Sequence, residues 1–198
     1  MNRGSSAESS SAGQSGNALE MASLAAAHLG IEDKLVLASS TGLIGVELPM
    51  ALIRNGVKNI TLDADGGHAL ARSIRTTDTI SKEFAVSFTI DGIDYIIGGI
   101  AKGSGMIHPN MATMLAFIAT DVAIEKKILN RALKETSDQT FNRITVDGNT
   151  STNDMVLILA NNKVKNERIQ AGSSAYRKFV SKLTELCLDL SHKIVLDG

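Results

Sequence analysis

One loop of the sequence combines residue types that could carry out acyl transfer. Residues 102–115 begin with Lys102, contain two glycines and a proline, and reach Ala112 and Thr113 just before the apolar run 114–120. A threonine hydroxyl is a weak nucleophile until a base removes its proton, and a free α-amine on the same residue can be that base. Cleavage between Ala112 and Thr113 would create such an amine, so the pattern is consistent with a self-cleaving precursor. A threonine at the start of a strand is also common in proteins without this chemistry.

Acyl transfer further requires hydrogen-bond donors for the oxyanion that develops on the attacked carbonyl. Thr41 and Gly42 could supply a hydroxyl and an unobstructed backbone N–H. The same polar turn could hold a phosphate, but the spacing of a P-loop and its lysine is absent. Lys102 could bind a substrate carboxylate or be an ordinary surface lysine. All of these loops could also be simple turns, since glycine, asparagine and aspartate are the usual turn residues.

The sequence predicts no metal site. The acidic segment 147–154 could be read as a metal loop, but it lacks the spacing of an EF-hand loop, so a turn or an interface loop fits it better. His108 has no histidine partner at helical spacing, and the other three histidines are equally isolated. Cys187 falls in the apolar pattern of a helix, which favours a small core residue over a nucleophile.

Hydrophobic periodicity predicts the elements that must position these residues. An apolar stripe at helical spacing begins at Asn17 and ends at Gly30, and Asp91-Gly92 is typical of a hairpin turn. Because helices and strands alternate while several strand pairs look like hairpins, we expect the α/β class with mixed, α+β-like sheets. Further helices are predicted over 48–53, 64–74, 123–135 (capped by Asp121) and 174–192, and strands over 34–38, 84–90, 93–100, 114–120, 141–146 and 155–160, with a strand start at 194–196.

The composition excludes several classes of function. The chain has 198 residues, 43% hydrophobic and 21% charged, with a formal net charge of −1 and no block of like charge. Nucleic acids and anionic membranes are therefore poor partners, no apolar run could span a bilayer, and a cytoplasmic protein is expected. Residues 1–16 are rich in serine and glycine and predict a disordered leader. Residues 17–198 are expected to form one domain.

Residues 98–115, Gly-Gly-Ile-Ala-Lys-Gly-Ser-Gly-Met-Ile-His-Pro-Asn-Met-Ala-Thr-Met-Leu, carry a more specific signal. They closely resemble the processing segment of the bifunctional ornithine acetyltransferase / N-acetylglutamate synthase family of arginine biosynthesis. The likeness runs from about Asn17 to the last residue. Four further segments resemble blocks of that family in its order: 40–45, 75–79, 141–148 and 150–154.

The resemblance implies a precursor that cuts itself between Ala112 and Thr113. It then consists of an alpha-chain part, 17–112, and a beta-chain part, 113–198. The two pieces stay together, and two copies of each form an α2β2 heterotetramer. The implied architecture is layered αββα.

The resemblance also implies the reaction and its residues. Thr113 takes an acetyl group from N-acetylornithine, releases ornithine and passes the acetyl group to glutamate; some members accept acetyl-CoA as donor. Thr41 and Gly42 match the oxyanion positions, and Thr76 and Lys102 match positions that contact substrate. The family requires no metal or prosthetic group.

The sequence departs from the family at both ends. The family's long segment before Asn17 is replaced by the serine- and glycine-rich leader. Beyond Gly198 the family continues with a glutamate-containing block and further substrate-binding residues. We therefore expect a truncated, incomplete form of the fold. Two alternatives stay open: a catalytically impaired remnant or split-gene subunit that acts by pairing with a missing part, and a self-processing hydrolase with water as acceptor.

Overall fold

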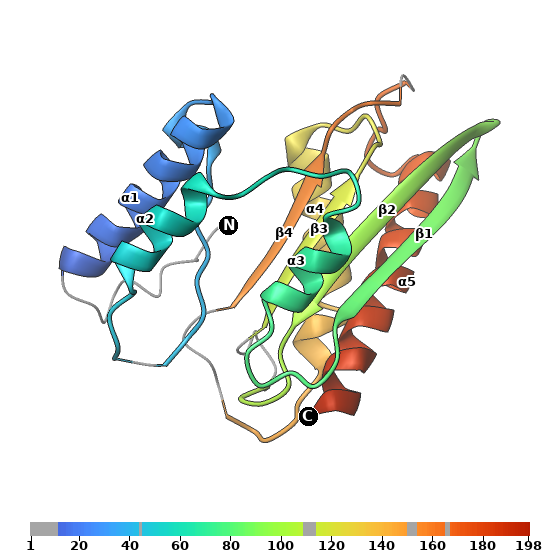
Figure 1. Ribbon diagram of the computed structural model, residues 1–198. Coiled ribbons are helices and arrows are strands. Elements are labelled where there is room, and N and C mark those ends of the chain that lie inside the picture. Colours follow the sequence, from blue (N-terminus) through green and yellow to red (C-terminus); the bar gives the residue numbers. More distant parts are fainter. Residues whose placement is uncertain (1–11, 44, 109–113, 150–153, 165–166) are drawn as a thin grey trace. The chain divides into compact units, whose positions relative to one another are not determined.

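The computed structural model describes residues 12–43, 45–108, 114–149, 154–164 and 167–198 (Figure 1). The chain divides into two compact units, Met1–Gly66 and Gly67–Gly198, and each is described by itself. The division places Thr41 and Gly42 in the first unit and the remaining candidate residues in the second.

The first unit is helical in its described residues. It contains α1 (Ala12–Leu29), the 3₁₀ turn η2 (Asp33–Leu35) and α2 (Met50–Lys58). Gly30 ends α1 with a φ of 67°, a left-handed conformation that glycine adopts without strain. Arg54 of α2 donates to both carboxylate oxygens of Glu20 of α1, at 2.5 and 3.0 Å.

Two predictions for this unit need correction. Helix α1 begins at Ala12, so residues 12–16 of the predicted leader are helical, while residues 1–11 lie outside the described residues. The strand predicted over 34–38 is wrong: η2 occupies its start, and the side chains of Leu35 and Leu37 are exposed. An apolar run forms a strand only where a partner strand can satisfy its backbone groups.

The second unit contains a four-stranded mixed sheet. Its strands are β1 (Lys82–Ile90), β2 (Ile93–Lys102), β3 (Leu115–Thr120) and β4 (Met155–Ala160), in that spatial order. The pairings β1–β2 and β2–β3 are antiparallel, and β3–β4 is parallel. The turn Asp91-Gly92 has positive φ angles of 50° and 78°, as a tight hairpin turn requires. The predicted mixed sheet is thus confirmed.

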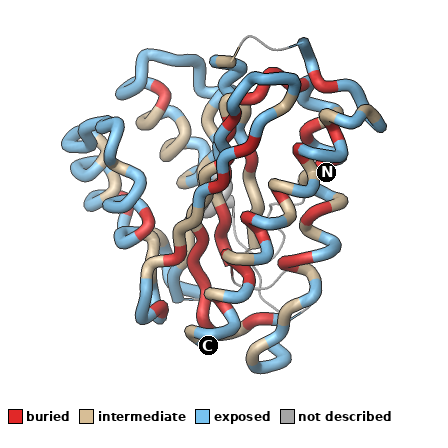
Figure 2. Tube along the Cα trace, turned by 90° about the vertical axis from the view of Figure 1, so that its right-hand side faces the viewer, coloured by how far each residue is buried: buried red, intermediate tan, exposed pale blue. Residues whose placement is uncertain are grey.

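Helices α4 (Lys126–Ser137) and α5 (Ser174–Asp197) cover one face of this sheet (Figure 1). The apolar stripe predicted for α5 is confirmed, because Phe179, Leu183, Leu186 and Leu190 are fully buried. Figure 2 shows the buried residues of the chain in red, along both strands and helices. A Cβ atom on Gly99 would lie 3.0 Å from Cδ2 of Leu186, so glycine at this point of β2 lets the helix pack closely.

The remaining helix, α3 (Gly67–Ser73), is shorter than the predicted 64–74 and precedes β1. Helix α4 starts after Glu125, so Asp121 is not its cap; Asp121 instead accepts the backbone N–H of Ile96 at 3.0 Å. Cys187 is buried in α5, as predicted, and burial raises the pKa of its thiol to about 12.

Two further predicted strands are wrong. Residues 141–146 begin with a 3₁₀ turn, η3 (Phe141–Arg143), because the Phe141 ring is drawn into the core. The apolar end 194–196 continues α5, where Ile194 extends the buried stripe by one turn. In both segments an apolar side chain is buried in the core, an example of tertiary packing that overrides a local strand preference.

Candidate functional site

The register of the sheet places one predicted residue, Lys102, at the end where three other strands begin. Lys82, the first residue of β1, lies opposite Ala101 near the end of β2. Lys102 lies opposite Leu115, the first residue of β3, and Leu115 lies opposite Met155, the first residue of β4. β2 therefore ends where the other three strands begin. We call these strand ends, with the segments that enter and leave them, the loop end of the sheet (Figure 1).

A buried ion network lies at the loop end. The ammonium of Lys82 donates to Asp78 at 2.7 Å and to Asp197 at 2.5 Å, and all three side chains are at most 2% exposed. The N–H of Thr79 donates to Asp197 at 3.0 Å, and its hydroxyl also donates to that carboxylate. Because α5 ends at Asp197, the network ties the end of this helix to the start of β1. We call Asp78, Lys82 and Asp197 the ion network.

Hydrogen bonds explain why the two carboxylates stay ionised inside the protein. Burial alone would raise the pKa of Asp78, but the N–H of Gly103 and the Lys82 ammonium outweigh it, so the pKa is lowered. Burial also acts on Asp197, yet hydrogen bonds from Lys82 and Thr79 lower its pKa to about 2. Both carboxylates are therefore charged at neutral pH, and both pair with the buried Lys82.

The ion network joins two segments that carry predicted substrate-binding residues. These are the threonine loop, residues 76–79, and the lysine loop, residues 102–108. The backbone N–H of Gly103 donates to Asp78 at 2.6 Å, and that of Thr76 donates to the same side chain at 3.2 Å. The hydroxyls of Thr77 and Ser104 lie 2.8 Å apart. The structure thus brings the loops of Thr76 and Lys102 together, as expected for one site.

Lys102 is not a surface lysine, since only 2% of the residue is exposed. Burial and the neighbouring Lys82 ammonium lower its pKa, while the carboxylates of Asp78 and Asp154 raise it, and the net result is a lowered pKa. A buried lysine with carboxylates near it can present a positive charge in a position that water does not screen well. This environment suits a group that binds a substrate carboxylate.

Two further carboxylates accept backbone N–H groups, one within the lysine loop and one beyond it. Asp147 accepts the N–H groups of Met106 and Ile107 at 2.6 and 3.0 Å, and these bonds, the Met106 bond foremost, lower its pKa. Asp154 accepts the N–H of Met114, the residue after Thr113, at 2.8 Å. The segment that the sequence left open as a metal loop or turn thus supplies acceptors for backbone donors.

The sequence predicted substrate contacts at Thr76 and Lys102 but gave no indication of the ion network. Asp78 and Lys82 are four residues apart outside any helix, and Asp197 lies more than a hundred positions away, so no local pattern joins them. The short spacing from Thr76 to Asp78 was a usable signal, because an aspartate two residues on often accepts a nearby backbone N–H.

Four of the predicted site residues are not placed against Lys102. Ala112 and Thr113 lie outside the described residues. In the first unit, Thr41 is half-buried, and a Cβ atom on the exposed Gly42 would meet no atom within 4 Å. Their arrangement around a substrate stays a prediction.

Among the residues that the structure describes, no group of three or more histidine, cysteine or acidic side chains could hold a metal ion. Within the same described ranges, no helix has the length and apolar character to span a membrane.

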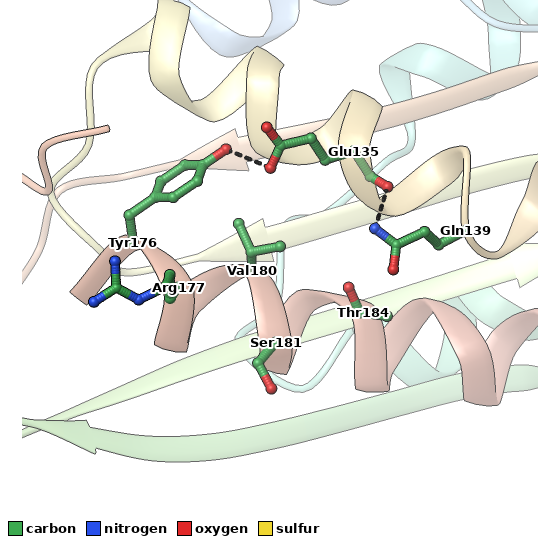
Figure 3. Close-up of a pocket in the computed structure, with 7 residues that line it drawn as sticks. All are labelled: Glu135, Gln139, Tyr176, Arg177, Val180, Ser181 and Thr184. Atoms are coloured by element: carbon green, nitrogen blue, oxygen red, sulfur yellow. Dashed lines mark hydrogen bonds between the residues drawn. The ribbon is translucent and has the colours of Figure 1, made fainter. Parts of the chain in front are cut away.

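A shallow pocket of about 380 Å³ lies between α4 and α5 (Figure 3). The Tyr176 hydroxyl donates to Glu135 at 2.8 Å, and burial and this bond raise the pKa of Tyr176 to about 12. We call this pocket between α4 and α5 the helix pocket. None of the site residues predicted from the sequence lines it. Its lining consists of Glu135, Gln139, Tyr176, Arg177, Val180, Ser181 and Thr184.

Comparisons with known proteins point to the same family that the sequence motifs resemble. The ArgJ family model matches residues 4–198. The arginine biosynthesis bifunctional protein ArgJ of Symbiobacterium thermophilum is 50% identical over 92% of this chain and 46% of its own length. The protein of the same name from Bacillus anthracis is 47% identical over 92% of this chain and 45% of its own.

A solved structure of the arginine biosynthesis bifunctional protein ArgJ from Bacillus halodurans is also similar. It shares 41% identity over 49% of this chain and 52% of that chain, with a TM-score of 0.47. The chain spans about half the length of the curated relatives it matches. Because the family model covers nearly all of its residues, the chain belongs to the ArgJ family.

Proposed function

We propose that this chain takes part in arginine biosynthesis as an acetyltransferase with Thr113 as its nucleophile. Membership of the ArgJ family supports the reaction class. The register of β2 and β3 is the observation that supports placing the reaction at the loop end of the sheet. It sets the buried Lys102 opposite Leu115, two positions after Thr113.

The first step is self-cleavage. The Thr113 hydroxyl attacks the Ala112 carbonyl carbon, the C–N bond breaks, and the nitrogen takes up the proton. Water then hydrolyses the resulting ester, which releases the Ala112 carboxylate and leaves Thr113 with a free α-amine. That amine is the base that a threonine nucleophile needs.

The second stage is acetyl transfer. The Thr113 oxygen attacks the acetyl carbonyl of N-acetylornithine, the amide C–N bond breaks, and ornithine leaves with the proton. The α-amine of glutamate then attacks the acetyl ester, which yields N-acetylglutamate and restores the hydroxyl. Thr41 and Gly42 would donate hydrogen bonds to the oxyanion of each stage. Lys102 and Thr76 would contact the substrate, and acetyl-CoA is a second donor that the same ester chemistry admits.

Intact mass after expression of the complete gene product tests the first stage. We expect two polypeptides, divided between Ala112 and Thr113, and a single uncut chain for Thr113→Ala. Thr89→Ala is the matched control, because this hydroxyl is on the exposed face of β1 and donates to Asp94. An uncut wild-type chain would contradict the proposed self-cleavage.

Acetyl release from N-acetylornithine tests the second stage. Release that depends on added glutamate identifies a transferase, whereas release into water identifies a hydrolase. Native mass spectrometry of the cleaved protein measures whether the pieces assemble as α2β2. Activity that appears only after a second polypeptide is added would favour the split-gene alternative.

A further inference from the structure

We infer that Asp78 is a positioning residue, which fixes the lysine loop against the threonine loop so that Lys102 and Thr76 face one substrate. The inference rests on the proposed function for its catalytic consequence. Its geometric basis is independent of that function, because every contact that carries it lies within the described residues of the second unit.

The first observation is that one carboxylate serves three segments of the chain. Asp78 accepts the Gly103 N–H at 2.6 Å, the Lys82 ammonium at 2.7 Å and the Thr76 N–H at 3.2 Å. Its side chain is fully buried. Charge-assisted hydrogen bonds in a buried place are stronger than neutral ones and fix geometry more closely. The residue after Lys102 and the backbone of Thr76 are therefore held by one side chain.

The second observation is a natural contrast within the ion network. Asp197 shares the Lys82 ammonium, at 2.5 Å, and is almost equally buried. Its remaining contacts go to the N–H and hydroxyl of Thr79, and neither touches the lysine loop. The two carboxylates thus differ in one respect that matters here: Asp78 binds the backbone beside Lys102, and Asp197 does not.

The third observation concerns the charge on Lys102. Of the charged groups that act on this lysine, Asp78 and Asp154 favour its protonated form, while burial and Lys82 oppose it. Asp78 therefore supports Lys102 in two ways, through the loop backbone and through its own negative charge. Loss of that charge should lower the pKa of Lys102 further.

The test compares Asp78→Asn with Asp197→Asn in the complete gene product. Both variants remove one carboxylate from Lys82, so both should lower the unfolding temperature. We expect Asp78→Asn alone to slow acetyl transfer by about a hundredfold, mainly in kcat, because misplacement by about 1 Å has effects of that size. Because a charged Lys102 is needed, activity falls as pH rises through its pKa. The alkaline limb of the pH–rate profile should therefore move to lower pH for Asp78→Asn and stay in place for Asp197→Asn.

A second readout does not depend on catalysis. Hydrogen exchange of the lysine loop, measured on a Thr113→Ala background, should become about tenfold faster with Asp78→Asn and change little with Asp197→Asn. If wild-type protein neither cleaves nor transfers, the proposed function fails while the exchange measurement still decides the positioning. Equal exchange in the two variants would overturn the inference. Faster exchange with unchanged transfer would overturn its catalytic part.

A third variant covers the case in which Asp78→Asn does not fold. Asp78→Glu keeps the charge beside Lys82 but moves the carboxylate by one methylene. We expect a folded protein with slowed transfer and an unchanged alkaline limb. Acetyl transfer at the wild-type rate in this variant would show that the position of the carboxylate at residue 78 does not matter for the reaction, which would contradict the inference.

Discussion

Two ion pairs of the second unit have the same spacing and nearly the same length, but very different surroundings. Asp78 and Lys82 are four residues apart with a distance of 2.7 Å, and Arg131 and Glu135 are four residues apart with a distance of 2.8 Å. The first pair is fully buried at the loop end of the sheet, whereas the side chains of the second are 61% and 37% exposed beside the helix pocket.

Burial, and not distance, decides what each of these ion pairs contributes. Water screens the exposed pair, so its removal changes little. The buried pair is weak evidence for added stability, but removal of one partner leaves a charge without compensation inside the protein. The loop end is therefore the region where a single substitution should have large effects. Four measurements test this contrast.

The largest effect is expected for Lys82→Met. The methionine fills most of the space but leaves Asp78 and Asp197 without their shared cation, and such a loss destabilises by about 3–5 kcal/mol. Urea denaturation measures the free energy of unfolding, and Arg131→Met is the matched control. A loss of stability no larger than that of the control would contradict the contrast between the two pairs.

A double-mutant cycle gives the next effect. Lys82 and Asp78 contact each other directly, at 2.7 Å. For Lys82→Met combined with Asp78→Asn we therefore expect a coupling energy of about 2 kcal/mol in the free energy of unfolding. The corresponding cycle with Arg131→Met and Glu135→Gln should give no measurable coupling. Additive effects in the buried cycle would show that the two residues act independently.

Acid should weaken the loop end through Asp197. The pKa of its carboxyl falls from an ordinary 3.8 to about 2 in the folded state, so its ionised form favours folding. This contribution, about 2 kcal/mol, is complete above about pH 4 and is lost as the pH falls toward 2. Unfolding free energies between pH 5 and 2 should therefore decline less steeply for Asp197→Asn than for the wild type.

The smallest effect is expected at the helix pocket. Tyr176→Phe removes the hydroxyl that donates to Glu135 and keeps the ring of a residue that is 5% exposed. One hydrogen bond beside solvent contributes about 1 kcal/mol or less. Thermal unfolding with Ser181→Ala as control would measure it, and a loss as large as that of Lys82→Met would contradict the contrast.

The sequence predicted the elements whose pattern is long and one-sided. The β1–β2 hairpin was readable from Asp91-Gly92, and α5 from the spacing of its leucines, because both signals are local. The strand predicted over 141–146 failed because Phe141 is buried by tertiary packing that the segment itself does not encode. The strand predicted at 194–196 failed because an apolar run of three residues fits the end of a helix equally well.

The candidate site was predictable only in part, for a similar reason. Lys102 and Thr76 were identified by the family resemblance, and the structure joins their loops. The carboxylate that joins them, Asp78, belongs to a network whose third member comes from the far end of the chain. Such long-range contacts leave no trace in local spacing, whereas burial of the whole set makes them evident once the fold is known.

The inner position of β3 has a consequence for the protein after the proposed cut. Six residues of β3 pair with β2, which precedes the cut, and six pair with β4, which follows it. The sheet would then be shared between two polypeptides, and unfolding would release two molecules in place of one. Its stability would depend on protein concentration, so dilution alone would lower the melting temperature of the mature protein while leaving that of the uncut precursor unchanged.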